Sequence, residues 1–463
     1  MNTCATDPSR IRADLESIFL AGVARVDPER LIREALRLDG SHLAVATDHG
    51  ERRYDLDRFE RIIVLGAGKA TAKMARAVEE VLGRRIADGV ISVKYGHTET
   101  LERIRTIEAG HPLPDDAGVR AAREITELAT AADCRTLAIV LISGGGSALM
   151  AAPAVFGEGD EKLGLTLEDK QAVTRALLSC GATIAETNCI RKHLSRIKGG
   201  RLAALLYPAT TISLILSDVV GDPLDAIASG PTVCDHTSFA DAAGVIARYD
   251  IADKIPRAIS KYLDLGGQGR VPETPKVGDA VFERVENVLV GTNSLALEAA
   301  RAAAESRGYR AEILRSPVVG EARDAARGLY GIAKDAHRRA RPGQSFCLIA
   351  GGETTVTLHG GGKGGRNQEM ALAFLVELAG LPEPISGIYF LSASTDGDDG
   401  PTDAAGAFAD DGVLAAARAA GLDLATFLEA NDSYPFFERI SFLLRTGPTN
   451  TNVCDIHLIA LSA

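Results

Sequence analysis

The sequence predicts an α/β protein of two domains, the first of which is built on a parallel sheet. Short apolar runs alternate with helical segments along most of the chain. The runs Arg61–Leu65, Thr136–Ile142 and Thr211–Leu216 are apolar almost throughout, which is typical of parallel strands that helices cover on both faces. Glycine clusters follow at least four such runs, and ligands of open α/β sheets bind beyond the carboxyl ends of the strands.

Length and composition agree with a globular protein and limit the partners and the cellular location that we expect. The chain has 463 residues, 46% of them hydrophobic and 24% charged, as in ordinary globular proteins. Its formal net charge of −11 does not favour nucleic acid or an anionic membrane as a partner. We expect no secretory leader and no membrane-spanning helix, because no apolar run is long enough. Seven scattered cysteines without a C-x-x-C pair favour reduced thiols and a cytoplasmic location.

The first half of the chain contains the elements of the expected parallel sheet. Amphipathic helices come first, and Pro28 opens a second helix that we expect to run through Leu38. A helix begins after Thr166, where an acidic residue three positions later completes a capping box, and the next helix carries residues 190–201. The other expected strands and helices of this half are Lys69–Leu82, Gly89–Val93, Arg105–Ala109 and Asp116–Ala129.

A second series of strands and helices begins near Asn287. The segment Gly266–Pro275 (GGQGRVPETP) is rich in glycine and proline, so we place the domain boundary there and expect domains at residues 1–275 and 276–463. The elements expected in the second domain are the strands Asn287–Val290, Arg310–Leu314, Ser345–Ala350 and Gly387–Ser392 and the helix Ser294–Ser306.

The segment Gly66-Ala67-Gly68-Lys69 follows the first apolar run. It is not a Walker loop, because Ala70 stands where that motif needs Ser or Thr. It is a poor dinucleotide fingerprint, because the next strand ends at Val93-Lys94 without the acid that holds the ribose. We expect a helix N-terminus with free amides and Lys69 in its first turn, which is an anion site. A solvated surface lysine is the alternative.

Two further segments of the first half favour anion binding. The loop Ser143-Gly144-Gly145-Gly146-Ser147 offers close backbone approach and two hydroxyls, which suit a carboxylate or a phosphate. It is not a nucleophile elbow, because the last glycine of that motif is missing. Residues 190–201 contain five Arg or Lys side chains and no acid. A solvated basic face would explain them, and positioning of an anionic substrate is the functional alternative, for which we select Arg191 and Lys198.

Acidic residues follow a strand in each half of the chain. Asp218 and Asp222 come after one apolar run, and Asp396, Asp398 and Asp399 come after another. Aspartate often serves only to form turns at such places. As ligands, Asp218 and Asp396 would suit Mg²⁺, which takes one or two carboxylates together with phosphate oxygens and water.

Glycine-rich segments of the second half complete the set of candidate sites. Gly351-Gly352-Glu353 follows an apolar run, and residues 360–365 contain five glycines directly before Arg366. We expect the second loop to be mobile and to close around a ligand, with Arg366 at a helix start where phosphate would dock.

The chain resembles the glycerate 2-kinases of the MOFRL type over nearly its whole length. The resemblance rests on GAGKA, GHPLPD, LISGGGSALM, IRKHLSRIKGGRLA, LSDVVGDPLDAIASGPT, GGETTVTL, GGKGGRNQE and STDGDDGPTDAAGA. It implies a Rossmann-like N-terminal domain, an active site in the cleft between two α/β domains, and ATP-dependent phosphorylation of D-glycerate to 2-phosphoglycerate with Mg²⁺. It also implies that Lys69 and Arg366 act in phosphoryl transfer.

With this resemblance, each candidate residue receives an expected role. The glycerate carboxylate would lie on residues 143–147 with Arg191 and Lys198, and Asp218 is the candidate base. The residues expected at the nucleotide are Gly66, Gly68, Gly351, Gly352, Glu353, Gly364 and Gly365. We expect a monomer or a homodimer. An NAD(P)H-dependent hydroxypyruvate reductase and a non-catalytic sensor of a small organic acid are the alternatives.

Overall fold

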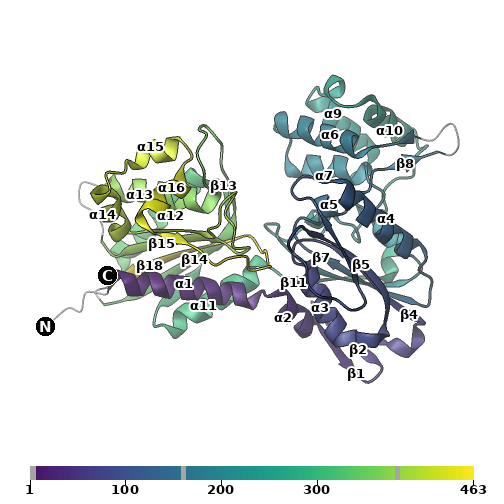
Figure 1. Ribbon diagram of the computed structural model, residues 1–463, viewed down its shortest axis with the longest axis horizontal. Coiled ribbons are helices and arrows are strands. Elements are labelled where there is room, and N and C mark those ends of the chain that lie inside the picture. The colour runs from purple at the N-terminus through teal and green to yellow at the C-terminus, as the bar shows by residue number, and fades with distance from the viewer. Residues whose placement is uncertain (1–6, 158–162, 342, 381–385, 463) are drawn as a thin grey trace. The chain divides into compact units, whose positions relative to one another are not determined.

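The computed structural model describes residues 7–157, 163–341, 343–380 and 386–462 (Figure 1). Contacts divide the chain into two compact units. We call Pro28–Val290 the parallel-sheet unit. The chain up to Asp27 and the chain from Gly291 onward together form what we call the mixed-sheet unit. Among the described residues, no helix is both long enough and apolar enough to cross a membrane.

The parallel-sheet unit is built on a six-stranded sheet in the order β11–β10–β7–β4–β5–β6. The four pairings from β10 to β6 are parallel, which confirms the expected arrangement. Every residue of β7 is buried, because helices cover both faces. The strands are β4 (Arg61–Ala67), β5 (Ile86–Lys94), β6 (Arg105–Ala109), β7 (Thr136–Ile142), β10 (Thr210–Leu216) and β11 (Val285–Gly291).

Helices of two groups pack in this unit. The first group contacts the six-stranded sheet and comprises α3 (Thr71–Leu82), α4 (Asp116–Thr130), α5 (Gly146–Leu149) and α8 (Arg201–Leu206). The second group shares a separate hydrophobic core and forms one end of the unit in Figure 1. It comprises α6 (Leu167–Ser179), α7 (Ile184–His193), α9 (Phe239–Arg248) and α10 (Arg257–Gly267), with the short strands β8 (Val155–Phe156) and β9 (Leu163–Gly164) nearby.

Two expected helices of this unit end earlier than predicted. Helix α2 (Pro28–Ala35) does not reach Leu38, because residues from Leu36 on form a three-stranded antiparallel sheet. Its strands are β1 (Leu36–Asp39), β2 (His42–Thr47) and β3 (Gly50–Asp55). Helix α7 ends at His193, and α8 begins only after Gly199 and Gly200, whose φ angles of 57° and 78° interrupt a helix. The capping box at Thr166 and Asp169 is confirmed.

The mixed-sheet unit contains a seven-stranded sheet in which the last strand of the chain is central. Its order is β12–β14–β18–β15–β16–β17, and β13 also pairs with β14. Strands β12 and β13 run parallel to β14, whereas β18 runs antiparallel to both β14 and β15. The strands are β12 (Arg310–Ile313), β13 (Val318–Glu321), β14 (Ser345–Thr355), β15 (Ile388–Ser394), β16 (Gly406–Ala409), β17 (Leu443–Leu444) and β18 (Asp455–Ser462).

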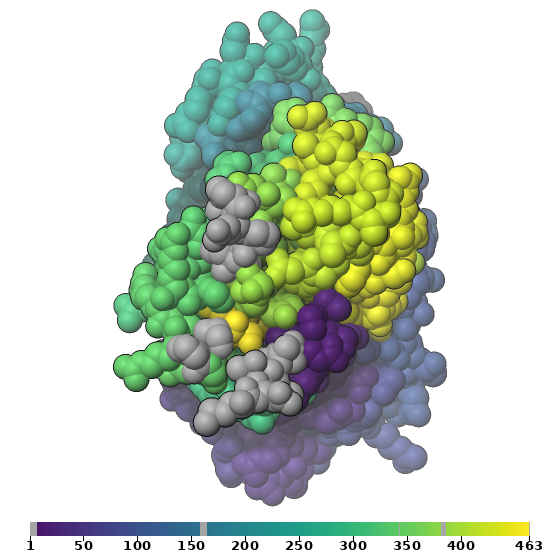
Figure 2. Space-filling model, turned by 90° about the vertical axis from the view of Figure 1, so that its left-hand side faces the viewer, coloured from purple at the N-terminus to yellow at the C-terminus, as the bar shows by residue number. Residues whose placement is uncertain are grey.

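Helices cover both faces of this sheet. Helices α1 (Pro8–Arg25) and α11 (Asn293–Ser306) lie side by side on one face, and α12 (Ala322–Arg339) and α13 (Arg366–Ala379) lie on the other (Figure 1). The remaining helices are α14 (Asp411–Ala419), α15 (Leu424–Glu429) and α16 (Ser433–Ile440). In Figure 2 the purple N-terminal helix touches green and yellow residues of this unit.

The two ends of the chain therefore belong to one unit. Thr451 donates a hydrogen bond to the carbonyl oxygen of Val26 at 2.7 Å, and α1 packs against α11. Contacts divide the chain between Val290 and Gly291, whereas the sequence analysis places the boundary after residue 275. The difference arises because β11 pairs with β10 and so extends the parallel sheet.

Candidate functional site

The loop after β7 is fastened to the turn between β4 and α3. The hydroxyl of Ser143 accepts a hydrogen bond from the amide of Ala70 at 3.1 Å and lies 3.1 Å from the hydroxyl of Thr71. Ser143 is fully buried. Its side chain therefore joins two strand ends, and the more open part of the loop begins at Gly145, which has a φ of 80° and caps α5.

The expected free amides near Lys69 are engaged within the fold. The amide of Lys69 donates to the carbonyl oxygen of Gly144 at 2.9 Å, and the amide of Gly68 donates to that of Ser92 at 3.1 Å. Helix α3 begins at Thr71, so Lys69 precedes the helix and does not lie in its first turn. Neighbouring strand ends therefore use the amides of Gly68 and Lys69, and the anion site expected at this helix start stays a prediction. This turn contributes the side chain of Lys69.

Lys69, His111 and Asp218 lie close to Gly144 and Gly145, two of the three glycines in the loop after β7. A Cβ atom added at Gly145 would lie 2.9 Å from His111 Nε2 and 3.5 Å from Lys69 Cγ. A Cβ atom added at Gly144 would lie 2.2 Å from Asp218 Oδ2. The glycines are thus required because side chains approach their Cα atoms closely. Lys69 and Asp218 thus lie beside neighbouring glycines of one loop, together with His111 from the segment GHPLPD.

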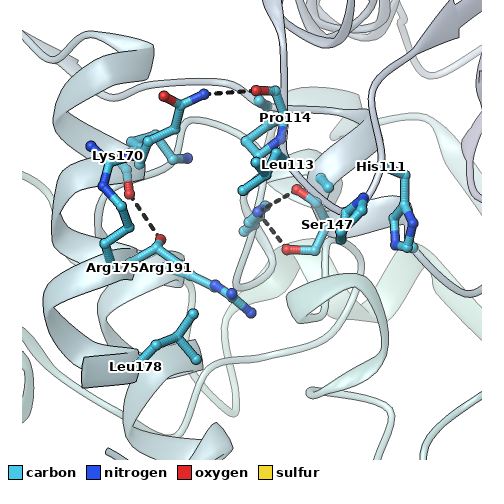
Figure 3. A pocket seen from close by; sticks show the side chains of 15 residues that line it. His111, Leu113, Pro114, Ser147, Lys170, Arg175, Leu178 and Arg191 are labelled. Carbon is cyan, nitrogen blue, oxygen red and sulfur yellow. Dashed lines mark hydrogen bonds between the residues drawn. The ribbon is translucent and has the colours of Figure 1, made fainter. Parts of the chain in front are cut away.

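A cavity of ≈ 320 Å³ opens beside this loop (Figure 3). Four of the residues that the sequence analysis assigns to the substrate line it, namely Gly145, Ser147, Arg191 and Lys198. Helix α6 adds Lys170 and Arg175, which sequence reasoning missed. A lysine on an amphipathic helix resembles a solvent-facing residue in the sequence, and only the fold shows that Lys170 lines this cavity.

Positive charge is concentrated in the cavity. Lys198 is buried, and its Nζ donates to the carbonyl oxygen of Ser147 at 2.7 Å and to the hydroxyl of Ser147 at 2.6 Å. Burial, followed by the charges of Lys170 and Arg191, holds the pKa of Lys198 well below its usual range. No Asp or Glu is among the described residues that line the cavity. Such a site is suited to a carboxylate or a phosphate, whose charge would favour the protonated lysines.

The basic stretch 190–201 divides into cavity residues and structural residues. Arg191 and Lys198 line the cavity. Lys192 forms buried ion pairs with Asp225 at 2.9 Å and Asp235 at 3.3 Å. Arg201 donates to the carbonyl oxygen of Pro272. These roles cannot be separated from the sequence alone, because the partners of Lys192 and Arg201 come from other segments.

In the mixed-sheet unit, Arg366 is held by two carboxylates. Its Nε and Nη2 atoms donate to Asp455 at 2.5 and 2.8 Å, and its Nη1 lies 3.1 Å from Glu353. Asp455 is fully buried at the start of β18. Although burial opposes the charge of Arg366, Asp455 and Glu353 hold its pKa above its usual range. The guanidinium is therefore charged and fixed in orientation, which suits recognition of a phosphate.

The N-terminus of α13 is already capped by a carboxylate. Asp399 accepts hydrogen bonds from the amides of Asn367 at 3.1 Å and Gln368 at 2.8 Å. Asp399 is buried, and burial raises its pKa to about 7. These two amides are therefore not available to a ligand, and the expectation that phosphate docks beside Arg366 at this helix start stays a prediction. What remains available at this helix start is the side chain of Arg366.

The first glycine segment of this unit lies in a strand. Strand β14 continues to Thr355, so Gly351 and Gly352 lie within it and pair with β18. A Cβ atom at Gly351 would lie 1.9 Å from Asn293 Oδ1, and one at Gly352 would lie 2.1 Å from the carbonyl oxygen of Val318. The expected loop is wrong here, and these glycines allow close packing inside the sheet.

The second glycine segment lies against the turn between α15 and α16. The amides of His359 and Gly360 donate to Asn431 Oδ1 at 2.7 and 3.0 Å, and that of Gly362 donates to Ala430 at 3.0 Å. The last two glycines of the segment are also closely packed, since a Cβ atom at Gly364 would lie 2.1 Å from Ser433 Oγ. A Cβ atom at Gly365 would lie 2.3 Å from Cγ of Asp399. Several amides of the loop are thus hydrogen-bonded to this turn, and its expected closure around a ligand stays a prediction.

The candidate metal ligands lie in separate units. Asp396 accepts hydrogen bonds from the hydroxyl of Ser394 at 2.7 Å and the amide of Asp398 at 3.2 Å. Asp218 lies against Gly144. In the part of the chain that the structure describes, no three His, Cys, Asp or Glu side chains converge to hold a metal ion. A single carboxylate still fits Mg²⁺ that is bound mainly through phosphate oxygens and water.

Comparisons with known proteins cover nearly the whole chain. The model of a domain of unknown function, DUF4147, matches residues 14–264, and that of the MOFRL family matches residues 346–455. A glycerate 2-kinase of Pyrococcus horikoshii is 39% identical over 94% of this chain and 93% of its own. A provisionally named hydroxypyruvate reductase of Agrobacterium vitis is 42% identical over 97% of this chain and 94% of its own. The crystal structure of a glycerate kinase from Thermotoga maritima superposes with a TM-score of 0.81 at 36% identity, over 98% of this chain and 100% of the other.

Proposed function

We propose that this chain, which belongs to the MOFRL family, transfers a phosphoryl group from ATP to D-glycerate and yields 2-phosphoglycerate. The observation that supports this most directly is the cationic cavity beside Lys69. It gathers lysine and arginine side chains next to a glycine loop, and none of its described lining residues carries a carboxylate. An anionic substrate of three carbons would neutralise part of that charge.

The substrate carboxylate would bind in the cavity. Arg191 offers a guanidinium, and Lys198 and Ser147 form a hydrogen-bonded pair on the opposite side of the same space. The amides of Gly144 and Gly145 would add close backbone contacts, whereas that of Gly146 donates to the carbonyl oxygen of Ser143. The 2-hydroxyl would then lie toward Lys69 and Asp218, which approach the same glycines. In this proposal Asp218 accepts the proton of that hydroxyl.

Phosphoryl transfer depends mainly on positioning and on neutralised charge. Lys69 and Arg366 would supply the positive groups, with Arg366 oriented by Asp455. The nucleotide would contact Glu353, Gly364 and Gly365 of the mixed-sheet unit. We propose that Mg²⁺ arrives with ATP and neutralises its phosphate oxygens, with Asp218 or Asp396 as the protein ligand.

The name of the Agrobacterium relative makes hydroxypyruvate reduction the second candidate. Two features of this chain speak against it. Strand β5 ends at Val93 and Lys94, where a dinucleotide site would have an acid for the ribose. The amides of Gly68 and Lys69, which would approach the pyrophosphate, bond to Ser92 and Gly144.

Two assays on the purified protein separate these functions. We expect ADP formation that requires D-glycerate, with 2-phosphoglycerate identified by phosphorus NMR. We expect no oxidation of NADH or NADPH with hydroxypyruvate. Reduced-nucleotide turnover without ATP would refute the kinase assignment. Formation of 3-phosphoglycerate would agree with a kinase but would contradict transfer to the 2-hydroxyl.

A further inference from the structure

Lys170 is a buried cation that the roles proposed so far do not use. It lies on α6 with a relative exposure of 8%, and it lines the cavity with Arg191 and Lys198. Among the residues that the structure describes, its Nζ has no hydrogen-bond partner. Figure 3 shows Lys170 and Arg175 on one helix, across the cavity from Ser147. The side chain is thus held within the space where an anion would bind.

The surroundings of Lys170 are unfavourable for a charged amine. Burial, followed by the charge of Arg191, lowers its pKa to about 8. The other ionisable groups that line the cavity are Arg175 on the same helix, Arg191 on α7, Lys198 and His111, and none of them is acidic. Burying a cation without a partner costs free energy. A bound anion would offset this cost, whereas an apolar side chain such as Met would avoid it altogether.

We propose that Lys170 is a substrate-binding residue whose Nζ, together with Arg191, holds the carboxylate of the substrate. Lys198 already donates to both oxygens of Ser147, so it supports the loop on the other side of the cavity. The inference rests on the proposed function and names a residue that discriminates between anionic and neutral substrates. A neutral polyol of the same size, such as glycerol, would leave Lys170 and Arg191 without a counter-charge.

Anion binding at Lys170 has a measurable consequence for protons. Near pH 8 the free amine is partly deprotonated, and a carboxylate beside it favours the protonated form. Substrate binding should therefore take up a fraction of a proton from the buffer, about one half at pH 8. The other ionisable residues around Lys170 are Arg175, Arg191, Lys198 and His111. Burial also holds the pKa of Lys198 well below its usual range, but Lys198 stays in place in the variants below, so a difference in proton uptake between the parent protein and Lys170→Met reports on Lys170.

The test compares Lys170→Met with Lys170→Arg and with Lys261→Met. Lys261 is exposed on α10 of the same helical group, so its variant removes a lysine charge outside the cavity. Kinetics should show a KM for D-glycerate that rises roughly tenfold to a hundredfold in Lys170→Met. The KM for ATP should stay nearly unchanged. Lys170→Arg should recover part of the affinity, and Lys261→Met should behave as the parent protein.

Calorimetry of D-glycerate binding at pH 8, in two buffers of different ionisation enthalpy, gives the second readout. Proton uptake should be present in the parent protein and in Lys261→Met, and reduced in Lys170→Met. An unchanged KM and unchanged uptake in Lys170→Met, with only a higher melting temperature, would overturn the inference. If the parent binds D-glycerate with Lys170-dependent uptake but forms no ADP, the proposed reaction fails and the role of Lys170 stands.

Discussion

Replacing Arg366 with Met should destabilise the mixed-sheet unit, because it leaves a fully buried carboxylate without its partner. Asp455 accepts two hydrogen bonds from Arg366 and has no exposed surface. Breaking a buried pair by removing one member typically costs about 3–5 kcal/mol. For a domain of roughly 150–250 residues, 1 kcal/mol corresponds to a shift of about 2–4 °C. We therefore expect the melting temperature of this unit to fall by roughly 6–20 °C.

The contact of Arg366 with Glu353 adds little to this figure. The Glu353 side chain is 43% exposed, so water replaces the lost ion pair. The double variant Arg366→Met/Asp455→Asn removes the uncompensated charge and should be more stable than Arg366→Met alone. Thermal unfolding of the parent, the two single variants and the double variant completes a thermodynamic cycle.

The same four proteins separate stability from catalysis. If Arg366 stabilises charge that develops during transfer, kcat should fall by about a thousandfold or more in both proteins that lack it. The more stable double variant should not regain activity. The reasoning is refuted if Arg366→Met melts within a degree of the parent, or if the double variant recovers a normal kcat.

Three further predictions concern other residues. Lys69→Met should lower kcat at least a hundredfold with little change in melting temperature; near-normal steady-state turnover would exclude Lys69 from transfer. Asp218→Asn should raise the Mg²⁺ concentration for half-maximal activity and leave calorimetric glycerate binding normal; an unchanged titration and a normal kcat, with only the stability reduced, would assign Asp218 a structural role. Burial lowers the pKa of His457 from its usual 6.5 to about 4, so its contribution to stability is present above pH 6.5 and is lost as the pH falls toward 4. Burial raises the pKa of Asp399 to about 7, so its contribution to stability has the opposite pH dependence and is lost as the pH rises through 7. The variant His457→Asn keeps only the contribution of Asp399. Its free energy of unfolding in urea should therefore fall more steeply than that of the parent as the pH rises from 4 to 7. Parallel plots of unfolding free energy against pH for the two proteins would contradict this.

The strands of the parallel sheet could be predicted because burial on both faces leaves a continuous apolar run. Thr136–Ile142 and Arg105–Ala109 agree with β7 and β6 to the residue. Strand β18 was not predicted, although it is central in the second sheet. Its partners β14 and β15 are distant in sequence, and polar residues such as Asp455 and His457 interrupt its apolar pattern.

The candidate site was predictable where the sequence itself carries the geometry. Glycines at strand ends and a local excess of positive charge pointed to Gly145, Ser147, Arg191 and Lys198, which line one cavity. The sequence does not show which backbone amides are already hydrogen-bonded, because their acceptors are distant in the sequence. The amides at the start of α13 appear available in the sequence, yet Asp399 accepts from them in the folded chain.

The two units hold their functional cations in opposite ways, and this determines how variants should behave. In the parallel-sheet unit, Lys170, Arg191 and Lys198 are crowded together, and no carboxylate is among the described residues around them. Replacing Lys170, whose amine has no hydrogen-bond partner among the described residues, with an apolar residue should stabilise the free protein and weaken substrate binding. In the mixed-sheet unit, Arg366 is paired with Asp455 before any ligand arrives. Removing it should reduce stability and kcat together, because the same ion pair that fixes the guanidinium also balances a buried charge.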